Sequence, residues 1–290
     1  MIDHAINPLD GRYFEKTRAL APYFSEFALM KYRVMIECEY LIALSILNKL
    51  ALRRFTQNEI KIIRNLDEKF NNTSYEKIKK YEVTTNHDVK AVEYFIKEKL
   101  SKTSLKNSAE WVHFALTSED TNNIAYALIL SDSLEKVIIP SIKEIIFNLN
   151  KLALKHKNLP MLARTHGQSA SPTTFGKEMT VFTVRLKKQL KNLQDMQIEA
   201  KLNGATGNYN AHIVACPNIN WIEFSKKFIE SFNKKRSQKL KANLITTQIE
   251  CHDSYVTVFD AFRRINTILL DFNQDIWRYI SDGWIEQIPQ

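Results

Sequence analysis

Apolar side chains recur at every third or fourth position between Phe175 and Leu193, for about five helical turns. The intervening members of this stripe are Met179, Phe182, Leu186 and Leu190. Ser171-Pro172 precedes the stripe, and a proline suits the first turn of a helix. One apolar stripe of this length is typical of a helix packed in a bundle. It therefore predicts an architecture of long helices.

The same spacing marks three other long segments, residues 26–50, 118–154 and 253–280. Ser25 is placed to cap the first of them, and Thr56 with Glu59 forms a capping box before a further helix. Pro140 interrupts the segment 118–154, where either a kink or a break is expected.

Glycine is rare in this sequence. Only six occur, and four of them lie between Gly167 and Gly207, while no convincing alternating strand pattern is present. We therefore expect an all-α protein with a smaller N-terminal helical domain over residues 1–106. A long-helix bundle is expected over residues 107–290. Because such helices seldom bury their stripes within one chain, association between subunits is also expected.

Composition narrows the functional class. The three cysteines are widely spaced, which favours free thiols in a reducing cytoplasm. Residues 1–11 lack a basic segment followed by an apolar run, and no stretch approaches 18 uninterrupted apolar residues, so a soluble, untargeted chain without a membrane partner is expected. The net charge of +9 is spread along the chain without interleaved aromatic residues or a binding module. We therefore expect no nucleic-acid partner.

Polar residues gather at several predicted helix starts. Asn7–Tyr13 contains the pair Arg12 and Tyr13, and an arginine fork suits phosphate or carboxylate. Thr84-Thr-Asn-His-Asp88 and Thr117-Ser-Glu-Asp120 could each bind a ligand or only cap a helix. Both interpretations stay open from these residues alone.

Two other segments carry more chemistry. Arg164-Thr-His-Gly-Gln168 combines a cation, hydrogen-bonding groups and an imidazole, in a predicted loop between two long helices. Asn203–His212 is a glycine-bearing polar loop without the strand context of a nucleotide fingerprint. No convincing metal site, serine nucleophile or catalytic cysteine is present. The remaining inventory of proton donors, acceptors and anion-binding groups suits acid–base elimination.

These segments resemble bacterial adenylosuccinate lyases of the fumarase and aspartase superfamily, in order and in spacing, from about Pro8 to the C-terminus. The matching strings are Asp10-Gly-Arg-Tyr13, Thr84-Thr-Asn-His-Asp-Val-Lys-Ala-Val-Glu-Tyr94, Thr117-Ser-Glu-Asp120, Arg164-Thr-His-Gly-Gln168, Gly204-Ala-Thr-Gly-Asn-Tyr-Asn-Ala-His212 and Thr246-Thr-Gln-Ile-Glu250. The resemblance implies a cofactor-free, metal-free homotetramer that releases fumarate from adenylosuccinate and from a succinylated aminoimidazole carboxamide ribotide.

The resemblance also implies roles for individual residues. His166 is implied to be the acid that protonates the departing nitrogen, and His87 to orient that acid or the substrate phosphate. The implied substrate-binding residues are Arg12, Tyr13, Asn86, His87, Asp88, Thr117, Ser118, Thr165 and Gln248. Sites in this family are assembled from several subunits. A nucleotide with a phosphate and two carboxylates would need such donors.

One family feature is not found in this sequence. The family's general base is a serine in a Ser-Ser-x-Met-Pro-x-Lys-x-Asn-Pro signature, and no such string occurs. We therefore expect an N-terminal portion, with the base and a C-terminal helical domain outside these residues. Two alternatives stay open. One is a catalytically incompetent fragment that acts only as a helical oligomerisation unit, and the other is a related lyase, such as one acting on argininosuccinate.

Overall fold

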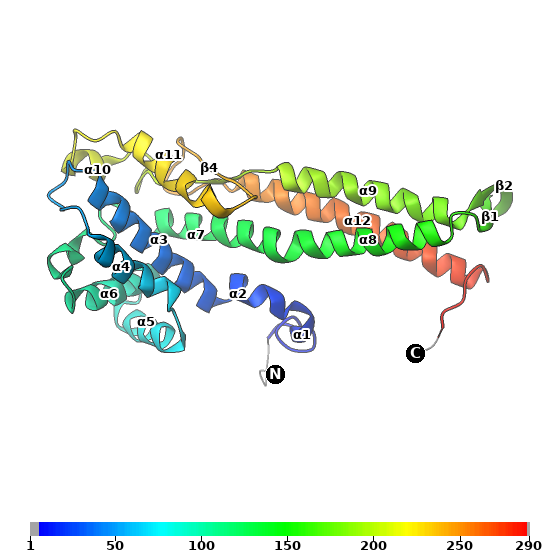
Figure 1. Ribbon diagram of the computed structural model, residues 1–290, viewed down its shortest axis with the longest axis horizontal. Helices are drawn as coiled ribbons and strands as arrows, with labels where there is room; N and C mark the ends of the chain where they lie inside the picture. Colours follow the sequence, from blue (N-terminus) through cyan, green and yellow to red (C-terminus); the bar gives the residue numbers. More distant parts are fainter. Residues whose placement is uncertain (1–5, 289–290) are drawn as a thin grey trace. The chain divides into compact units, whose positions relative to one another are not determined.

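The computed structural model describes residues 6–288 and contains two compact units (Figure 1). Unit 1 comprises the chain up to Leu134 together with Gln197–His252, and unit 2 comprises Glu135–Met196 together with the chain from Asp253. These units are defined by contacts within this chain. They do not follow the expected domain boundary after residue 106, which stays a prediction.

Unit 1 is mostly helical. Its α-helices are α1 (Phe14–Thr17), α2 (Ala21–Phe24), α3 (Glu26–Ile46), α4 (Gln57–Glu68), α5 (Asn72–Thr85), α6 (Asp88–Ser101), α7 (Ser118–Ser133), α10 (Asn210–Ala215) and α11 (Trp221–Ser231). Short 3-10 turns cover Arg18–Leu20, Lys106–Trp111 and Phe232–Lys235. A parallel pair of three-residue strands, β3 (Ile198–Ala200) and β4 (Leu240–Ala242), completes the unit.

The predicted caps of unit 1 are confirmed. The side chain of Ser25 accepts a hydrogen bond from the amide of Ala28 at the start of α3. Thr56 and Glu59 form the reciprocal capping box of α4. Each such cap satisfies backbone amides that have no partner within the helix, and its loss costs about 1 kcal/mol. These helix starts are therefore determined by local sequence.

Helices α3 and α7 carry the centre of the unit 1 core and pack against each other. Their fully buried apolar residues include Val34, Leu41, Ile124 and Leu128. Burial of one such side chain stabilises the folded state by roughly 1.5–3 kcal/mol. The packing of α3 on α7 thereby fixes the start of α7, where one of the predicted polar segments lies.

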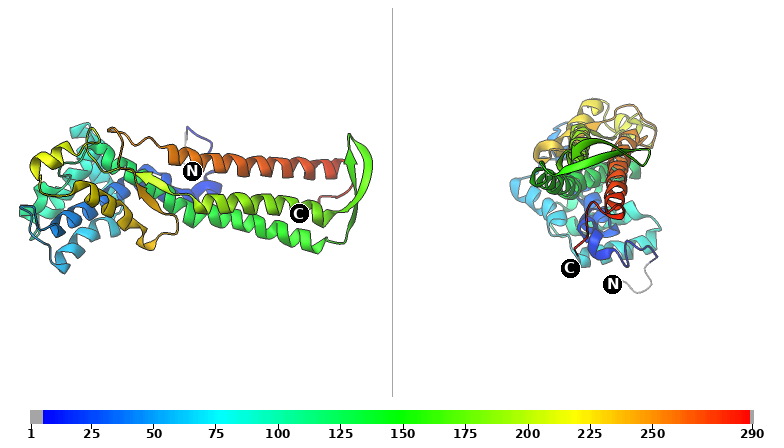
Figure 2. Two further views of the ribbon diagram at one scale, coloured as in Figure 1. Left: turned by 90° about the horizontal axis from the view of Figure 1, so that it is seen from above. Right: turned by 90° about the vertical axis from the view of Figure 1, so that its right-hand side faces the viewer.

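Unit 2 contains three long helices and a hairpin. The helices are α8 (Ile139–Lys155), α9 (Phe175–Asp195) and α12 (Asp253–Ser281), and the antiparallel strands are β1 (Pro160–Thr165) and β2 (Gln168–Thr174). Figures 1 and 2 show α8, α9 and α12 side by side along their length. All six residues of the predicted stripe in α9 are buried, which confirms the pattern. Gly176 lies so close to the carbonyl oxygen of Ala153 that a Cβ would clash, which explains this glycine inside a helix.

The structure differs from the sequence prediction at the hairpin and decides between the two alternatives at Pro140. The segment Arg164–Gln168 belongs to the β1–β2 hairpin, although no strand was predicted there. A π-helical stretch, Leu134–Ile138, connects α7 with α8, and Pro140 lies in the first turn of α8, where a missing amide costs little. Across residues 6–288, no helix combines the length and apolar character needed to cross a membrane. The expectation about a targeting segment rests partly on residues 1–5, outside the described residues.

Candidate active site

His87 occupies the N-cap position of α6, so its ring has a fixed hydrogen-bond direction. Nδ1 accepts a hydrogen bond from the amide of Lys90 at 3.2 Å. A neutral imidazole whose Nδ1 is an acceptor carries its proton on Nε2. That Nε2–H group donates to Oγ of Ser118 at 3.4 Å. The cap therefore sets the tautomer of His87 and aims an N–H donor at the start of α7.

Thr117 and Ser118, at the start of α7, meet a third segment of the chain. Nε2 of Gln248 donates to Oγ1 of Thr117 at 3.3 Å, across 131 residues of sequence. His87, Thr117, Ser118 and Gln248 are each at least partly accessible to solvent. We call these four residues the helix-start cluster. It joins four of the predicted substrate-binding residues in one place.

Asp88, the next residue after His87, is held by a buried arginine. Nη2 of Arg33 lies 2.6 Å from Oδ2 of Asp88, and Nε of Arg33 donates to Oδ1 of Asn122 on α7. Burial of the Asp88 carboxyl opposes its ionisation, but the Arg33 charge and the amide of Val89 outweigh this effect and hold the pKa below its usual range. Asp88 is therefore ionised at neutral pH and ties α6 to α3 and α7.

Sequence reasoning did not single out Glu119 and His252 as a site, although both lie beside the helix-start cluster. Nε2 of His252 is 4.0 Å from Glu119, and its Nδ1 is 3.4 Å from Glu250. Partial burial raises the pKa of Glu119, and nearby Asp120 and Glu250 act in the same direction, against the opposing charges of His252 and Lys201. The pair His252-Asp253 is visible in the sequence, but Glu119, the carboxylate that His252 approaches on α7, is 133 residues away in the chain.

Four residues of the predicted polar segments have a left-handed backbone conformation. Asn86, His166, Tyr209 and His252 have positive φ angles of 49°, 51°, 56° and 61°. Residues other than glycine adopt this left-handed region at a cost, and such residues are concentrated at functional sites. Asn86 ends α5 in this conformation, which turns the chain directly into the His87 cap. Its side chain is exposed next to the helix-start cluster.

The glycine-bearing loop packs behind the cluster. Nδ2 of Asn203 donates to Oγ1 of Thr246 at 2.8 Å. Gly207 has a φ of +77° and lies so close to the carbonyl group of Thr246 that any Cβ would clash. Both observations explain why this loop contains glycine and asparagine. The loop supports the segment that carries Gln248.

The predicted acid, His166, lies in unit 2 at the tip of the hairpin. His166 and Gly167 form a two-residue turn, with φ angles of 51° and 76°, between the paired residues Thr165 and Gln168. Two positive φ angles match a type I′ turn. Nδ1 of His166 and Oγ1 of Thr165 are 3.0 Å apart, and the imidazole is exposed.

A cavity of about 620 Å³ lies beside this turn within unit 2. His166 and Arg164 line it together with residues near the end of α12, including Asp275, Tyr279 and Trp284. Burial and the charges of Glu178 and Asp271 raise the pKa of Asp275, and burial together with Asp275 raises the pKa of Tyr279 to about 12. The cavity therefore places the imidazole of His166 among residues that include a carboxyl and a phenol group with raised pKa values.

Arg12 and Tyr13 belong to unit 1 and contact each other. The Arg12 guanidinium lies 5.5 Å from the centre of the Tyr13 ring, and both side chains are exposed. Among residues 6–288, no hydrogen bond or ion pair connects either of them to the cluster. Their predicted binding role therefore stays a prediction.

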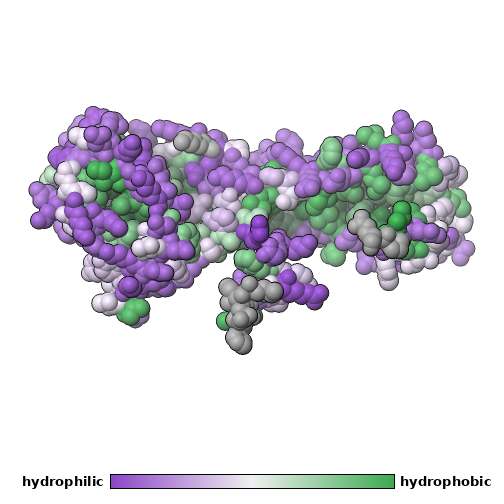
Figure 3. Space-filling view, turned by 60° about the horizontal axis from the view of Figure 1, so that its bottom comes forward, coloured by the Kyte–Doolittle hydropathy of each residue, from purple (hydrophilic) through white to green (hydrophobic). Residues whose placement is uncertain are grey.

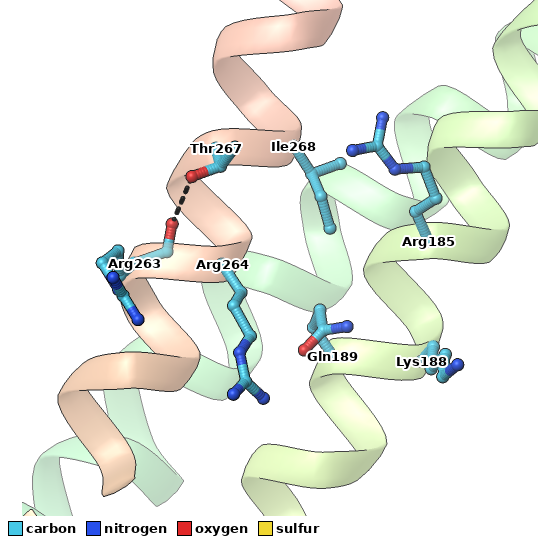
Figure 4. A pocket seen from close by; sticks show the side chains of 7 residues that line it. All are labelled: Arg185, Lys188, Gln189, Arg263, Arg264, Thr267 and Ile268. Atoms are coloured by element: carbon cyan, nitrogen blue, oxygen red, sulfur yellow. Dashed lines mark hydrogen bonds between the residues drawn. The ribbon is translucent and has the colours of Figure 1, made fainter. Parts of the chain in front are cut away.

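A second hollow in unit 2 contains cations instead of acid–base groups. Figure 4 shows Arg185 and Lys188 of α9 opposite Arg263 and Arg264 of α12, around a cavity of about 450 Å³. Arg185 pairs with Asp271, and Arg263 pairs with Asp260. None of the predicted site residues lines this hollow. Within the described part of the chain, no group of three or more His, Cys, Asp or Glu residues could hold a metal ion.

Comparison with known proteins agrees with the resemblance seen in the motifs. Residues 11–288 match the sequence pattern of the lyase family. The chain is 46% identical over 286 residues to adenylosuccinate lyase of Legionella pneumophila (strain Corby), and 48% identical over 290 residues to that of Dictyostelium discoideum. Each alignment covers 98% of this chain and 61% of the relative. The chain thus spans about three fifths of the length of these curated relatives.

The fold has a counterpart among solved structures. A fumarate lyase from Mesorhizobium sp. BNC1 superimposes with a TM-score of 0.70 at 17% sequence identity, over 92% of this chain and 57% of that chain. At this low identity the likeness concerns the fold alone. It confirms the predicted, mostly helical fold built on long helices.

Proposed function

The chain belongs to the lyase family, and on this premise we propose that it acts in the cofactor-free elimination of fumarate from adenylosuccinate, giving AMP. The analogous release from the succinylated aminoimidazole carboxamide ribotide is part of the same proposal, and both reactions serve purine biosynthesis. The observation that carries the proposal is the helix-start cluster. In it, residues from three separate motifs of the adenylosuccinate lyase pattern meet through the contacts His87–Ser118 and Gln248–Thr117.

The cluster suits a substrate with a phosphate and two carboxylates. The Nε2–H group of His87, the hydroxyl groups of Thr117 and Ser118 and the amide of Gln248 are donors within one small region. Donors fixed by capping and by contacts between distant segments of the same chain do not need to reorganise when an anion binds, which strengthens the electrostatic stabilisation of developing charge. We assign substrate binding to this cluster together with Asn86 and Asp88.

In the elimination, a general base takes a proton from the succinyl carbon next to a carboxylate, while the carbon–nitrogen bond breaks and its electron pair stays on the nitrogen. The electron pair of the carbon–hydrogen bond forms the double bond of fumarate, and the departing nitrogen takes up a proton. We assign the delivery of this proton to His166, assisted by Thr165, because an exposed imidazole at a turn can approach a bound substrate. We assign the orientation of the substrate to His87. Arg12 and Tyr13 are assigned to anion binding on the motif alone.

We further propose a homotetramer in the cytoplasm. Large apolar side chains remain exposed on the unit 2 helices, among them Phe147, Leu154, Val256, Leu270 and Trp277. Figure 3 shows apolar surface over the region of these helices. Such surface favours contact with a second copy of the chain. The three free cysteines are compatible with a reducing compartment.

The test uses complementation, because the resemblance implies sites shared between copies. The chain is assayed for fumarate release from adenylosuccinate alone and after mixing with a complete relative whose histidine at the His166 position is replaced by glutamine. We expect release from the mixture, since each component supplies what the other lacks. We expect none from the chain alone, because its sequence contains no serine signature. No release from any mixture, despite confirmed co-assembly, would contradict the proposal.

The two alternatives are separated by the same assay. A panel that contains adenylosuccinate and argininosuccinate distinguishes the proposed reaction from that of a related lyase. A catalytically incompetent scaffold would assemble with the relative but would not restore activity to the mixture.

A further inference from the structure

Asp120 and Lys201 form an ion pair that is fully removed from solvent. Nζ of Lys201 lies 2.9 Å from Oδ1 of Asp120, and neither side chain is accessible. Asp120 belongs to the first turn of α7, two residues after Ser118, whereas Lys201 follows β3. The pair therefore joins two segments that are 81 residues apart in the chain.

Lys201 is held in place by three further hydrogen bonds. Its Nζ also donates to the carbonyl oxygen of Gly204 at 3.0 Å. The amide of Lys201 donates to Oδ1 of Asn123, and its carbonyl oxygen accepts from Nδ2 of the same residue. Asn123, in the second turn of α7, thus binds both backbone polar groups of Lys201, and the bond to Gly204 ties the ammonium group to the glycine-bearing loop.

Asp120 accepts hydrogen bonds from three backbone amides in addition to its ion pair. Oδ2 accepts from the amide of Thr117 at 3.0 Å, and Oδ1 accepts from the amide of Asn203 at 3.1 Å. The amide of Gly204 lies within 3.3 Å of both oxygens. One carboxylate thereby fixes the start of α7 and the start of the glycine-bearing loop relative to each other.

The connection continues to Gln248. Asn203 donates through its side chain to Thr246, and Gly207 packs directly against the backbone of Thr246. Thr246 precedes Gln248 by two residues, and Gln248 in turn contacts Thr117. The path from Asp120 through Asn203, Thr246 and Gln248 therefore ends at Thr117, whose amide also donates to Asp120.

A fully buried ion pair is weak support for stability, because removing two charges from water costs about as much as their attraction returns. Apolar residues of similar volume would fill the same space without that cost. We infer that Asp120 and Lys201 are positioning residues, which hold Thr117, Ser118 and Gln248 in the arrangement that binds the substrate. This inference rests on the proposed function for its ligand, while the positioning itself does not.

The first experiment measures positioning without a ligand, by amide hydrogen exchange. The variant Lys201→Met is compared with Ile124→Val, a substitution of a fully buried α7 residue. Relative to the wild type, we expect the exchange rate of the segment 246–250 to rise about tenfold in Lys201→Met and to stay unchanged in Ile124→Val. If exchange rises only at residues 117–120 and 201–204, the pair does not position Gln248 and the inference is overturned.

A second variant covers the case in which Lys201→Met does not fold, because it leaves a buried carboxylate without its partner. The double substitution Asp120→Asn with Lys201→Met removes both charges, so it is expected to fold. A single carbonyl oxygen cannot replace two carboxylate oxygens for three amides. The same rise in exchange over residues 246–250 is therefore expected, and wild-type exchange in the folded double variant would overturn the inference.

The third measurement uses calorimetric titration with AMP. We expect the double variant to bind AMP roughly ten- to a hundredfold more weakly than the wild type, with Ile124→Val unchanged, because a shift of the binding groups by about 1 Å has effects of this size. Equal affinity in wild type and double variant would show a merely structural pair. If the wild type does not bind AMP, the proposed function fails for this chain, whereas the exchange data still decide the positioning.

Discussion

The helix-start cluster of unit 1 and the hairpin turn of unit 2 hold their histidines in opposite ways. His87 caps a helix, so a backbone amide occupies one of its ring nitrogens and sets its tautomer. His166 is exposed on a two-residue turn, where its described side-chain contact is with the neighbouring Thr165. A ring fixed by its backbone suits binding and orientation, whereas an exposed ring can approach and leave a substrate. We therefore expect replacement of His166 to lower turnover and replacement of His87 to weaken binding.

The largest expected effect is on catalysis at the turn. The substitution His166→Gln is made in this chain, which is then mixed with the relative that already lacks the equivalent histidine, so that neither component supplies the acid. Fumarate release from this mixture should fall by about 10² to 10⁴, the usual contribution of a positioned acid. Thermal stability should stay close to that of the parent, because the side chain is exposed. His156→Gln in the same unit provides the control. A loss of stability with nearly unchanged turnover would identify His166 as structural.

The next effect compares a glycine of each region. Gly207→Ala should destabilise unit 1 by about 2–4 kcal/mol, since the new Cβ clashes with Thr246 in a packed loop and a left-handed φ adds a further cost. Gly167→Ala has a similar φ but nothing within 4 Å of its Cβ, so only the backbone cost of about 1–2 kcal/mol is expected. Urea unfolding measures both. Equal losses would mean that the loop behind the cluster is no more tightly packed than the turn.

A pH effect of intermediate size comes from His212, the fully buried last residue of the glycine-bearing loop. Burial lowers the pKa of His212 to about 4, despite the opposing charge of Asp120. The unfolded chain, with a histidine pKa of about 6.5, therefore binds the proton first, and stability is lost as the pH falls from about 6.5 towards 4.

Between pH 7 and pH 5 this loss should be about 2 kcal/mol in the free energy of unfolding. His212→Gln should remove that part of the pH dependence, whereas His156→Gln should leave it in place. An unchanged pH profile in His212→Gln would mean that the buried ring is not neutral in the folded state.

The smallest effect separates the cap of His87 from its ring. His87→Asn keeps an N-cap acceptor, and His87→Ala removes it, so the two variants should differ by about 1 kcal/mol in stability. Both lose the imidazole, and both should bind AMP more weakly than the wild type. If His87→Asn binds as well as the wild type, the ring is only a cap.

Much of the helical framework follows from the sequence by itself. The stripe in α9, the cap at Ser25 and the capping box at Thr56 depend on residues within a few positions of one another, and each was predicted and confirmed. The polar residues at the helix starts were also visible, because they interrupt the apolar spacing. Local periodicity and capping act over one or two turns, so a single sequence is enough to show them.

Tertiary structure alone decided which of these residues meet. The contact of Gln248 with Thr117 spans 131 residues, and the ion pair of Asp120 with Lys201 spans 81. Neither has a local signature, since Asp120 also satisfies the ordinary pattern of a helix cap and Lys201 resembles any other lysine of a basic chain. The strands around His166 were missed for a similar reason, because their pairing satisfies backbone groups that the side-chain pattern does not reveal. The sequence thus determined the helices and the chemical groups they present, and long-range packing determined their arrangement.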